Sequence, residues 1–169
     1  MKRTHWLKML VALALLIIIA LVIVLPTGAH AAELPSTDPA TPCKLTAEEY
    51  DRLLACTELE GIGWMLRAGE DITGVNGLFV TAIIAQETGW GTSRLAREEN
   101  NLGGIAGSHG YRSFDSREEC ILYMFDLLDR LYIAQGRDTV EEISERYCVP
   151  PEHWAASIKS IMRTLIDKI

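Results

Sequence analysis

The segment from Gly77 to Thr88 constrains the fold more than any other part of this 169-residue chain. Its side chains are apolar on nearly every face of a helix. A helix of that kind has to be buried, because a surface helix carries one polar face. Asn76 can cap its start, and Gly89 and Gly91 stop it. We therefore expect a central core helix over residues 77–88, which the other helices surround.

The other helices are predicted by capping signals and by apolar residues that recur every three to four positions. No internal repeat and no alternating strand pattern of useful length is present. The sequence therefore predicts an all-α domain with a helical hairpin about Gly136. The first predicted helix begins after the Thr46 capping box, and the last begins at Pro151. Between them, helices are predicted over residues 59–67, 77–88, 93–99, 116–132 and 139–147.

The N-terminus has a basic flank followed by an unbroken apolar run. Lys2, Arg3 and Lys8 precede 17 apolar residues from Met9 to Leu25. This order is typical of an export signal, and the length is just below the roughly 20 residues that span a bilayer. Small residues before position 32 offer a cleavage site. Residues 1–32 are therefore expected to be a signal peptide or an uncleaved membrane anchor.

The composition then divides the rest of the chain into two parts. Residues 33–43 are rich in Pro, Thr, Ser and Ala and are predicted to be a linker. Residues 44–169 are long enough for one domain with a real core. We expect this domain to work outside the cytoplasmic membrane, secreted or anchored at the cell surface. Contact with a membrane is expected only through the N-terminal segment.

The balance of charges excludes some classes of partner. Of the 16 Lys and Arg residues, 3 lie in the N-terminal segment, so 13 stand against 23 Asp and Glu in the exported part. Its net charge is near −10, with no cluster of basic residues. This argues against nucleic acid or an anionic membrane surface as a partner. No cofactor or metal ion is indicated, and a monomer is expected.

The chain has four cysteines, an even number, in a part predicted to be exported. Disulfides are therefore favoured over metal ligands, and three pairings are open. The predicted helical hairpin brings Cys120 level with Cys148, which favours that pair and leaves Cys43 with Cys56. Four free thiols are the alternative, if the source lives without oxygen.

Glu87 is the candidate with the clearest physical rationale. It lies one turn after two isoleucines, at the C-terminal end of the predicted core helix. Burial and the negative end of the helix both disfavour a charged carboxylate. A general acid needs that condition to hold a proton near neutral pH. Trp90 follows between two glycines and offers a flat apolar face of the kind on which a sugar ring packs.

Four motifs in order resemble the bacterial glucosaminidase family, glycoside hydrolase family 73. Residues 87–93, Glu-Thr-Gly-Trp-Gly-Thr-Ser, are similar to its E-[ST]-G-W-G-x-S signature. Residues 100–105 resemble its N-N-L-F-G-I, and residues 111–119 its F-R-x-Y-x-S-x-x-E-S. The stretch from Tyr147 towards Trp154 resembles its Y-A-x-D-x-x-Y before the final helix. The resemblance covers roughly residues 76–169.

The resemblance implies a lysozyme-like α fold with a groove for the peptidoglycan glycan strand. The implied reaction is hydrolysis of a β-1,4 bond between N-acetylglucosamine and N-acetylmuramic acid. Glu87 falls on the catalytic acid and Tyr147 on a tyrosine of the cleft. The resemblance also implies substrate-binding residues that line or support the groove. These candidates are Trp90, Asn101, Phe114 and Tyr111.

The sequence departs from the family pattern in ways that affect the mechanism. Gly103 stands where the family usually has Phe, and Ile83 where many members have Gln. Only five residues separate Ile105 from Tyr111, where relatives often carry a longer hairpin with a second carboxylate. Asp115 is the nearest candidate for that second acid. Without one, the 2-acetamido group of the substrate could act as the nucleophile, with Tyr147 steadying the developing charge.

Two alternatives to this hydrolase stay open. A lytic transglycosylase on the same fold would break the strand without water as the acceptor. A muramidase on the same fold would break another bond of the strand. A wall-binding component of an envelope apparatus would keep the fold without turnover. The shortened loop and Gly103 are the features that keep the wall-binding alternative open.

Overall fold

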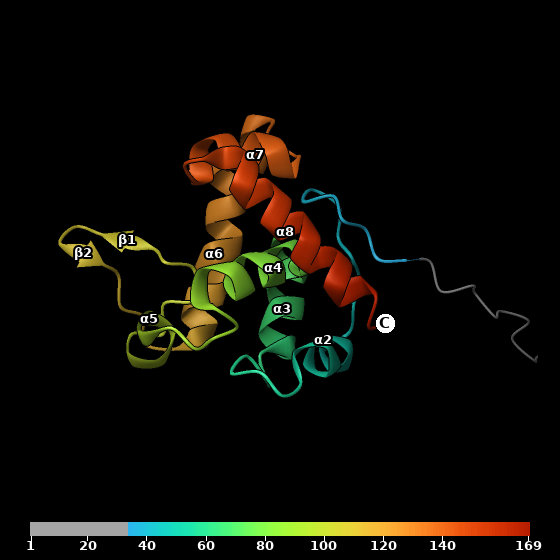
Figure 1. Cartoon of the computed structure of the whole chain (residues 1–169), viewed down its shortest axis with the longest axis horizontal. Helices are drawn as coiled ribbons and strands as arrows, with labels where there is room; N and C mark the ends of the chain where they lie inside the picture. The colour runs from blue at the N-terminus through green and yellow to red at the C-terminus, as the bar shows by residue number, and fades with distance from the viewer. Residues whose placement is uncertain (1–33) are drawn as a thin grey trace, which may run out of the picture. The chain divides into compact units, whose positions relative to one another are not determined.

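A computed structural model describes residues 34–169 of the chain, and these form one mainly helical unit (Figure 1). The predicted export segment, residues 1–32, lies outside the described residues. Within residues 34–169, no helix has the length and apolar character needed to cross a membrane. The elements in chain order are α2 (Ala47–Leu54), α3 (Gly63–Thr73), α4 (Gly77–Thr88), α5 (Arg94–Glu98), β1 (Ala106–Gly107), β2 (Gly110–Tyr111), α6 (Arg117–Leu131), the 3-10 helix η1 (Ile133–Gln135), α7 (Val140–Tyr147) and α8 (Pro151–Ile166).

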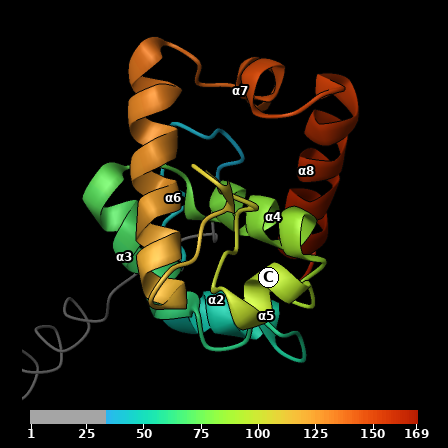
Figure 2. The same cartoon turned by 90° about the vertical axis from the view of Figure 1, so that its left-hand side faces the viewer.

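Helix α4 is the central helix that the sequence predicts. Nearly all of its side chains are buried, and it packs against α3 and α8. Figure 2 shows α6 and α8 on either side of the unit, with α7 between their ends and α4 crossing the space below α7. Helix α3 packs on α6 and α2, and α7 packs on α8. The all-round apolar pattern of residues 77–88 is thus explained by neighbours on several sides.

Side-chain caps fix the helix starts, as the sequence predicts. Capping boxes are complete at Thr46 and Thr139. Ser116 also accepts a hydrogen bond from the N–H of Glu119, but the Glu119 carboxylate accepts from Asp115 instead of completing the box. The prediction of a helix over 59–67 is wrong in its bounds. That helix starts at Gly63 and continues to Thr73, where Gly74 in the left-handed region ends it.

The segment predicted to be a linker makes specific contacts with the helical unit. The side-chain amide of Asn76 donates hydrogen bonds to the carbonyls of Ser36, Asp38 and Thr41, at 2.8, 3.0 and 2.9 Å. The buried Glu70 carboxylate accepts from the backbone N–H of Cys43 and Lys44. Residues 36–44 are therefore held on the helices. The composition of the segment gave no sign of these contacts, because the groups that bind it lie elsewhere in the chain.

A short hairpin corrects the all-α prediction. Strands β1 and β2 pair antiparallel, Ala106 opposite Tyr111 and Gly107 opposite Gly110. Each strand has two residues, too few to show an alternating pattern in the sequence. The hairpin projects from the helices between α5 and α6 (Figure 1). It occupies the shortened loop between Ile105 and Arg112.

Candidate active site

Glu87 lies in the last turn of α4, half-buried in the wall of a pocket of about 420 Å³. Gly89 follows in the left-handed conformation, and its N–H caps the carbonyl of Ala85. The chain can therefore leave the helix directly after Glu87 without covering its side chain. The pocket is lined by Glu87, Gly103, Gly104, Ile105, Ala106, Tyr123, Leu127, Tyr132, Tyr147 and Cys148.

Trp154 of α8 positions the Glu87 carboxylate. Its indole N–H donates a hydrogen bond to Glu87 Oε1 over 3.0 Å. The ring is buried, with the ring of Phe79 edge-on against it at a centroid distance of 6.5 Å. In the sequence, Trp154 stands at the end of a motif and on the apolar face of the last helix, and neither position by itself indicates this role. A Trp on the apolar face of a helix is expected to be buried, and its indole N–H then needs an acceptor. That requirement is the sequence signal that could have indicated the role of Trp154.

The other oxygen of Glu87 faces the loop after α5. A Cβ built on Gly104 would lie 3.5 Å from Glu87 Oε2. Gly104 has a φ of 61°, a left-handed conformation that favours glycine. Backbone rather than side chain therefore stands next to this oxygen, and a ligand can approach it closely.

Tyr147 stacks on the ring of Trp154, at a centroid distance of 4.7 Å and an angle of 30°. Tyr132 lies on the other side of Tyr147, with ring centroids 6.2 Å apart. Burial, and then the nearby Glu87 carboxylate, raise the pKa of the Tyr147 hydroxyl above its usual range. This hydroxyl is therefore protonated at neutral pH and can donate a hydrogen bond inside the pocket. The structure thus brings Glu87 and Tyr147 together, as the sequence predicts.

Asn101 supports the pocket wall from behind. Its side chain is fully buried, and Nδ2 donates to the carbonyls of Ile105 and Arg112 over 2.9 and 2.8 Å. Oδ1 accepts from the N–H of Ile105 over 2.8 Å. These bonds tie the pocket-lining loop to the base of the hairpin. Asn101 is thus a groove-supporting residue, one of the two roles that the resemblance left open.

The two aromatic candidates after the loop have different surroundings. Tyr111, on β2, is 65% exposed. Phe114 is buried against Tyr123, with ring centroids 5.6 Å apart, and the Arg112 guanidinium lies over both rings. Since Tyr123 lines the pocket, Phe114 supports the pocket from behind.

Trp90 and Asp115 are not among the residues that line the pocket. The ring of Trp90 is half-buried, and Lys168 Nζ lies 5.7 Å from its centroid. Asp115 is exposed at the approach to α6, where its backbone N–H donates to Glu119. Glu87 is therefore the one carboxylate among the described residues that line this pocket.

All four cysteines are free in the described structure, which corrects the predicted pairs. The Cys43 thiol lies 2.9 Å from the Tyr50 hydroxyl, and Cys120 Sγ accepts from the N–H of Leu102 over 3.2 Å. Cys56 is exposed, and Cys148 lines the pocket. The buried thiols are directed at other polar groups, because packing rather than sequence position decides which side chains meet. Among residues 34–169, no group of His, Cys, Asp or Glu could hold a metal ion.

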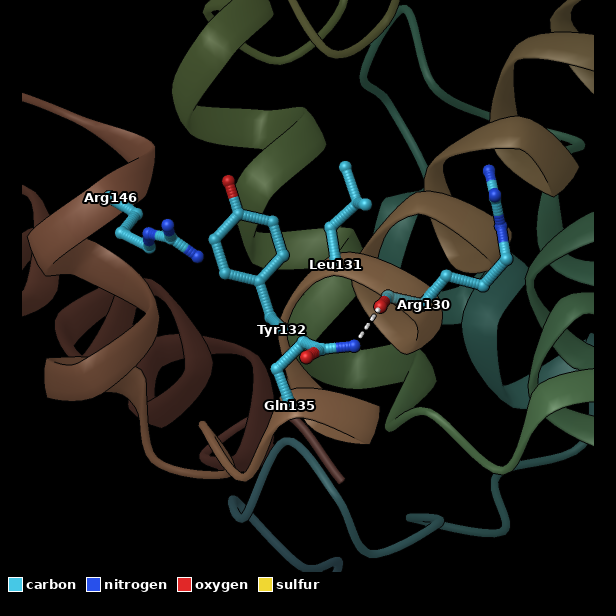
Figure 3. Close-up of a pocket in the computed structure, with 5 residues that line it drawn as sticks. All are labelled: Arg130, Leu131, Tyr132, Gln135 and Arg146. Atoms are coloured by element: carbon cyan, nitrogen blue, oxygen red, sulfur yellow. Dashed lines mark hydrogen bonds between the residues drawn. The ribbon is translucent and has the colours of Figure 1, made fainter.

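A second pocket of about 370 Å³ adjoins the first along the 3-10 helix. It is lined by Arg130, Leu131, Tyr132, Gln135 and Arg146 (Figure 3). Tyr132 lines both pockets, so the two pockets meet at this residue.

Residues 65–167 match the family Glucosaminidase, described as mannosyl-glycoprotein endo-beta-N-acetylglucosaminidase. The chain belongs to this family. The match contains the half-buried carboxylate of Glu87 and the aromatic rings beside it. The glucosaminidase family is one of glycoside hydrolases, and the family expected from the four motifs is thereby confirmed.

Curated relatives support the same family. Two Streptococcus pneumoniae proteins, provisionally named endo-beta-N-acetylglucosaminidase, are each 26% identical to this glucosaminidase-family chain over 138 residues. The matched region covers 73% of this chain and 21% and 20% of the two relatives. The chain thus spans about a fifth of the length of the curated relatives it matches.

Solved structures share the fold. The crystal structure of S. aureus autolysin E in complex with the muropeptide NAM-L-Ala-D-iGlu has a TM-score of 0.68 and 17% identity, covering 80% of this chain and 73% of that one. A catalytic mutant of autolysin E in complex with the disaccharide NAG-NAM gives the same score and identity, covering 83% and 74%. The glucosaminidase-family chain therefore has the mainly helical fold of autolysin E.

Proposed function

We propose that this domain hydrolyses the peptidoglycan strand at the β-1,4 bond between N-acetylglucosamine and N-acetylmuramic acid, with Glu87 as the general acid. The observation that carries the proposal is the Glu87 carboxylate itself. One oxygen is held by Trp154, and the other faces a pocket beside a glycine. The glucosaminidase family and the wall fragments bound to autolysin E support this substrate class.

The pocket favours substrate assistance over a pair of carboxylates. Two-carboxylate hydrolysis needs a second acid across the scissile bond. Asp115, our candidate from the sequence, is not in the pocket lining. In the proposed reaction Glu87 gives its proton to the glycosidic oxygen as the C1–O bond breaks. The 2-acetamido oxygen of the sugar that carries C1 bonds to C1 and closes a second, five-membered ring. Water then attacks C1, which opens that five-membered ring, and gives a proton to Glu87.

Tyr147 has a supporting role in this proposal. Its hydroxyl is protonated at neutral pH, and its ring is fixed by the stack on Trp154. The hydroxyl oxygen can steady the positive charge that develops at C1 and on the acetamido group. A fixed dipole is more effective in such a site than mobile water, because it needs no reorientation during the reaction.

The test is clearing of purified cell wall in a zymogram, with wild type beside Glu87→Gln. We expect wild type to clear the gel and the variant to lose activity by at least about 100-fold, the scale of a missing general acid. Glu152→Gln, an exposed change on the first turn of α8, is the matched control and should clear like wild type. Equal clearing by Glu87→Gln and wild type would contradict the role of Glu87.

Mass spectrometry of the released fragments identifies the bond. A reducing-end N-acetylglucosamine is expected. A reducing-end N-acetylmuramic acid would instead identify a muramidase, and an anhydro product a lytic transglycosylase.

The short hairpin favours a second candidate function, a wall-binding component without turnover. Its strands bring no carboxylate to the pocket. Binding of wild type to purified wall, with no clearing and no released fragments, would support that function over the hydrolase.

We further propose that residues 1–32 export the domain and that residues 44–169 act outside the membrane as a monomer. The excess of acidic residues after the basic N-terminal segment supports this arrangement. Cell fractionation tests it. The chain is expected in the membrane or the medium, and recovery in the cytosol would contradict export.

A further inference from the structure

The second pocket, beside the pocket of Glu87, contains a positively charged side chain, that of Arg146. Arg146 lies in the last turn of α7, and Figure 3 shows its guanidinium pointing towards the ring of Tyr132. Arg130, in the same pocket, turns away and is paired with Asp126 over 2.8 Å. Within residues 34–169, Arg146 forms no ion pair. The nearby acids on α7 are engaged or exposed. Glu141 binds Lys159, the Glu142 carboxylate accepts a hydrogen bond from the backbone N–H of Thr139, and Glu145 is exposed.

The positive charge of Arg146 acts on the hydroxyl of Tyr132, the residue that lines both pockets. Burial raises the pKa of the Tyr132 hydroxyl, while Arg146 and then Arg137 oppose that rise. Of these two guanidinium groups, that of Arg146 points towards the ring in Figure 3. The rest of the domain is strongly acidic, so an anion would be repelled from most of its surface. The pocket at Tyr132 is a local exception next to the active site.

The remaining side chains suit a short peptide. Leu131 is half-exposed and Tyr132 offers an apolar ring, which can cover a small aliphatic side chain. Gln135 donates from Nε2 to the Arg130 carbonyl over 3.3 Å, which leaves its side-chain oxygen to accept a peptide N–H. A phosphodiester polymer could pair with the Arg146 cation. It would have no group to pack on Leu131 and Tyr132 and no N–H to donate to Gln135.

We propose that this second pocket binds a carboxylate on the peptide branch of the glycan substrate, with Arg146 as its partner. The inference rests on the proposed function, because the glycan has to occupy the pocket of Glu87. The two pockets meet at Tyr132. Two extended residues span about 7 Å, enough to pass one aromatic ring. A branch of two amino acids can therefore reach Arg146 from a sugar beside Glu87.

The first experiment compares kinetics on two forms of the same glycan strand, one carrying its peptides and one stripped of them by an amidase. Arg146→Gln is expected to raise KM about 3- to 10-fold on the peptide-bearing strand, the range of an exposed charge pair, and to leave the stripped strand unchanged. Arg163→Gln, an exposed arginine on α8 that also forms no ion pair within residues 34–169, is the matched control. An equal change on both strands, or no change on either, would overturn the proposal.

The second experiment needs no turnover. N-acetylmuramoyl-L-alanyl-D-isoglutamate is titrated into Glu87→Gln, with and without Arg146→Gln, beside the fully amidated compound and inorganic phosphate. Weaker binding of the acid alone on loss of Arg146 supports the proposal. Equal competition by phosphate, or equal binding of acid and amide, overturns it. Wild type that clears no wall would refute the proposed function, whereas this titration would still decide the role of Arg146.

Discussion

The indole N–H of Trp154 donates a hydrogen bond to Glu87 Oε1 over 3.0 Å, joining helices α8 and α4 across 67 residues of sequence. Glu87 is half-buried in the last turn of α4, where the carboxylate would otherwise sample several rotamers. The bond selects one of them and directs the other oxygen to the pocket.

Trp154→Phe keeps a ring in the stack but removes the donor. We expect kcat to fall about 10-fold, because the acid is no longer held in one orientation. The free energy of unfolding should fall by about 1 kcal/mol for the lost hydrogen bond. Kinetics on peptide-free strands and urea unfolding measure the two effects. A variant with unchanged kcat would show that the bond has no role in orienting Glu87.

Tyr147→Phe removes one hydroxyl from the pocket and leaves the ring on Trp154. We expect kcat to fall between about 10- and 100-fold with little change in KM, as for loss of an interaction made mainly in the transition state. Near-ultraviolet circular dichroism should stay as in wild type, since the stack remains. A variant whose kcat stays within about twofold of wild type would contradict a role of the hydroxyl in the reaction.

Asn101→Ala removes three part-buried hydrogen bonds at the back of the pocket. The Arg112 carbonyl and the Ile105 N–H would lose this partner, whereas the Ile105 carbonyl keeps the Arg112 N–H at 2.9 Å. We expect the unfolding free energy to fall by about 2 kcal/mol, since each of the two groups left unpaired costs on the order of 1 kcal/mol or more. Thermal unfolding measures this. A loss of activity with unchanged stability would instead point to direct contact of Asn101 with substrate.

The thiols should differ in reactivity. Burial raises the pKa of Cys120 to about 11 and also raises that of Cys43, so both are protonated at neutral pH. In the native protein we expect an aromatic disulfide reagent to modify Cys56 rapidly and the two buried thiols only after unfolding. A reducing agent should leave the melting temperature unchanged. A melting temperature that falls on reduction would show that a disulfide is present.

Stability should decline at alkaline pH. Burial raises the pKa of the Tyr50 and Tyr147 hydroxyls above their usual range, and that of the Cys120 thiol to about 11. The folded chain therefore keeps protons that the unfolded chain releases above about pH 9 for the thiol and about pH 10 for the tyrosines. Each group lowers the unfolding free energy by up to about 1.4 kcal/mol per pH unit in that range. Urea midpoints taken between pH 7 and about pH 11 test this, and a constant midpoint would contradict it.

The cap residues and the apolar pattern of 77–88 allowed the central helix to be predicted to the residue. Both signals are local, since a capping side chain bonds to a backbone three residues away. The hairpin of two-residue strands was missed, because pairing across so short a segment leaves no periodic pattern. The bounds of α3 were wrong for a related reason. Buried Gly63 starts that helix without a side-chain cap, so no capping signal marks the position.

The sequence alone indicates the helical class of the chain, the position of Glu87 at the end of the core helix, and the family that its motifs resemble. The surroundings of Glu87, in contrast, depend on the tertiary structure. Trp154 and Gly104 come to the carboxylate from α8 and from the loop after α5, Asp115 does not line its pocket, and the cysteines remain unpaired. Helix propensity and capping act over a few residues, whereas these contacts depend on how distant helices pack, which no local pattern encodes.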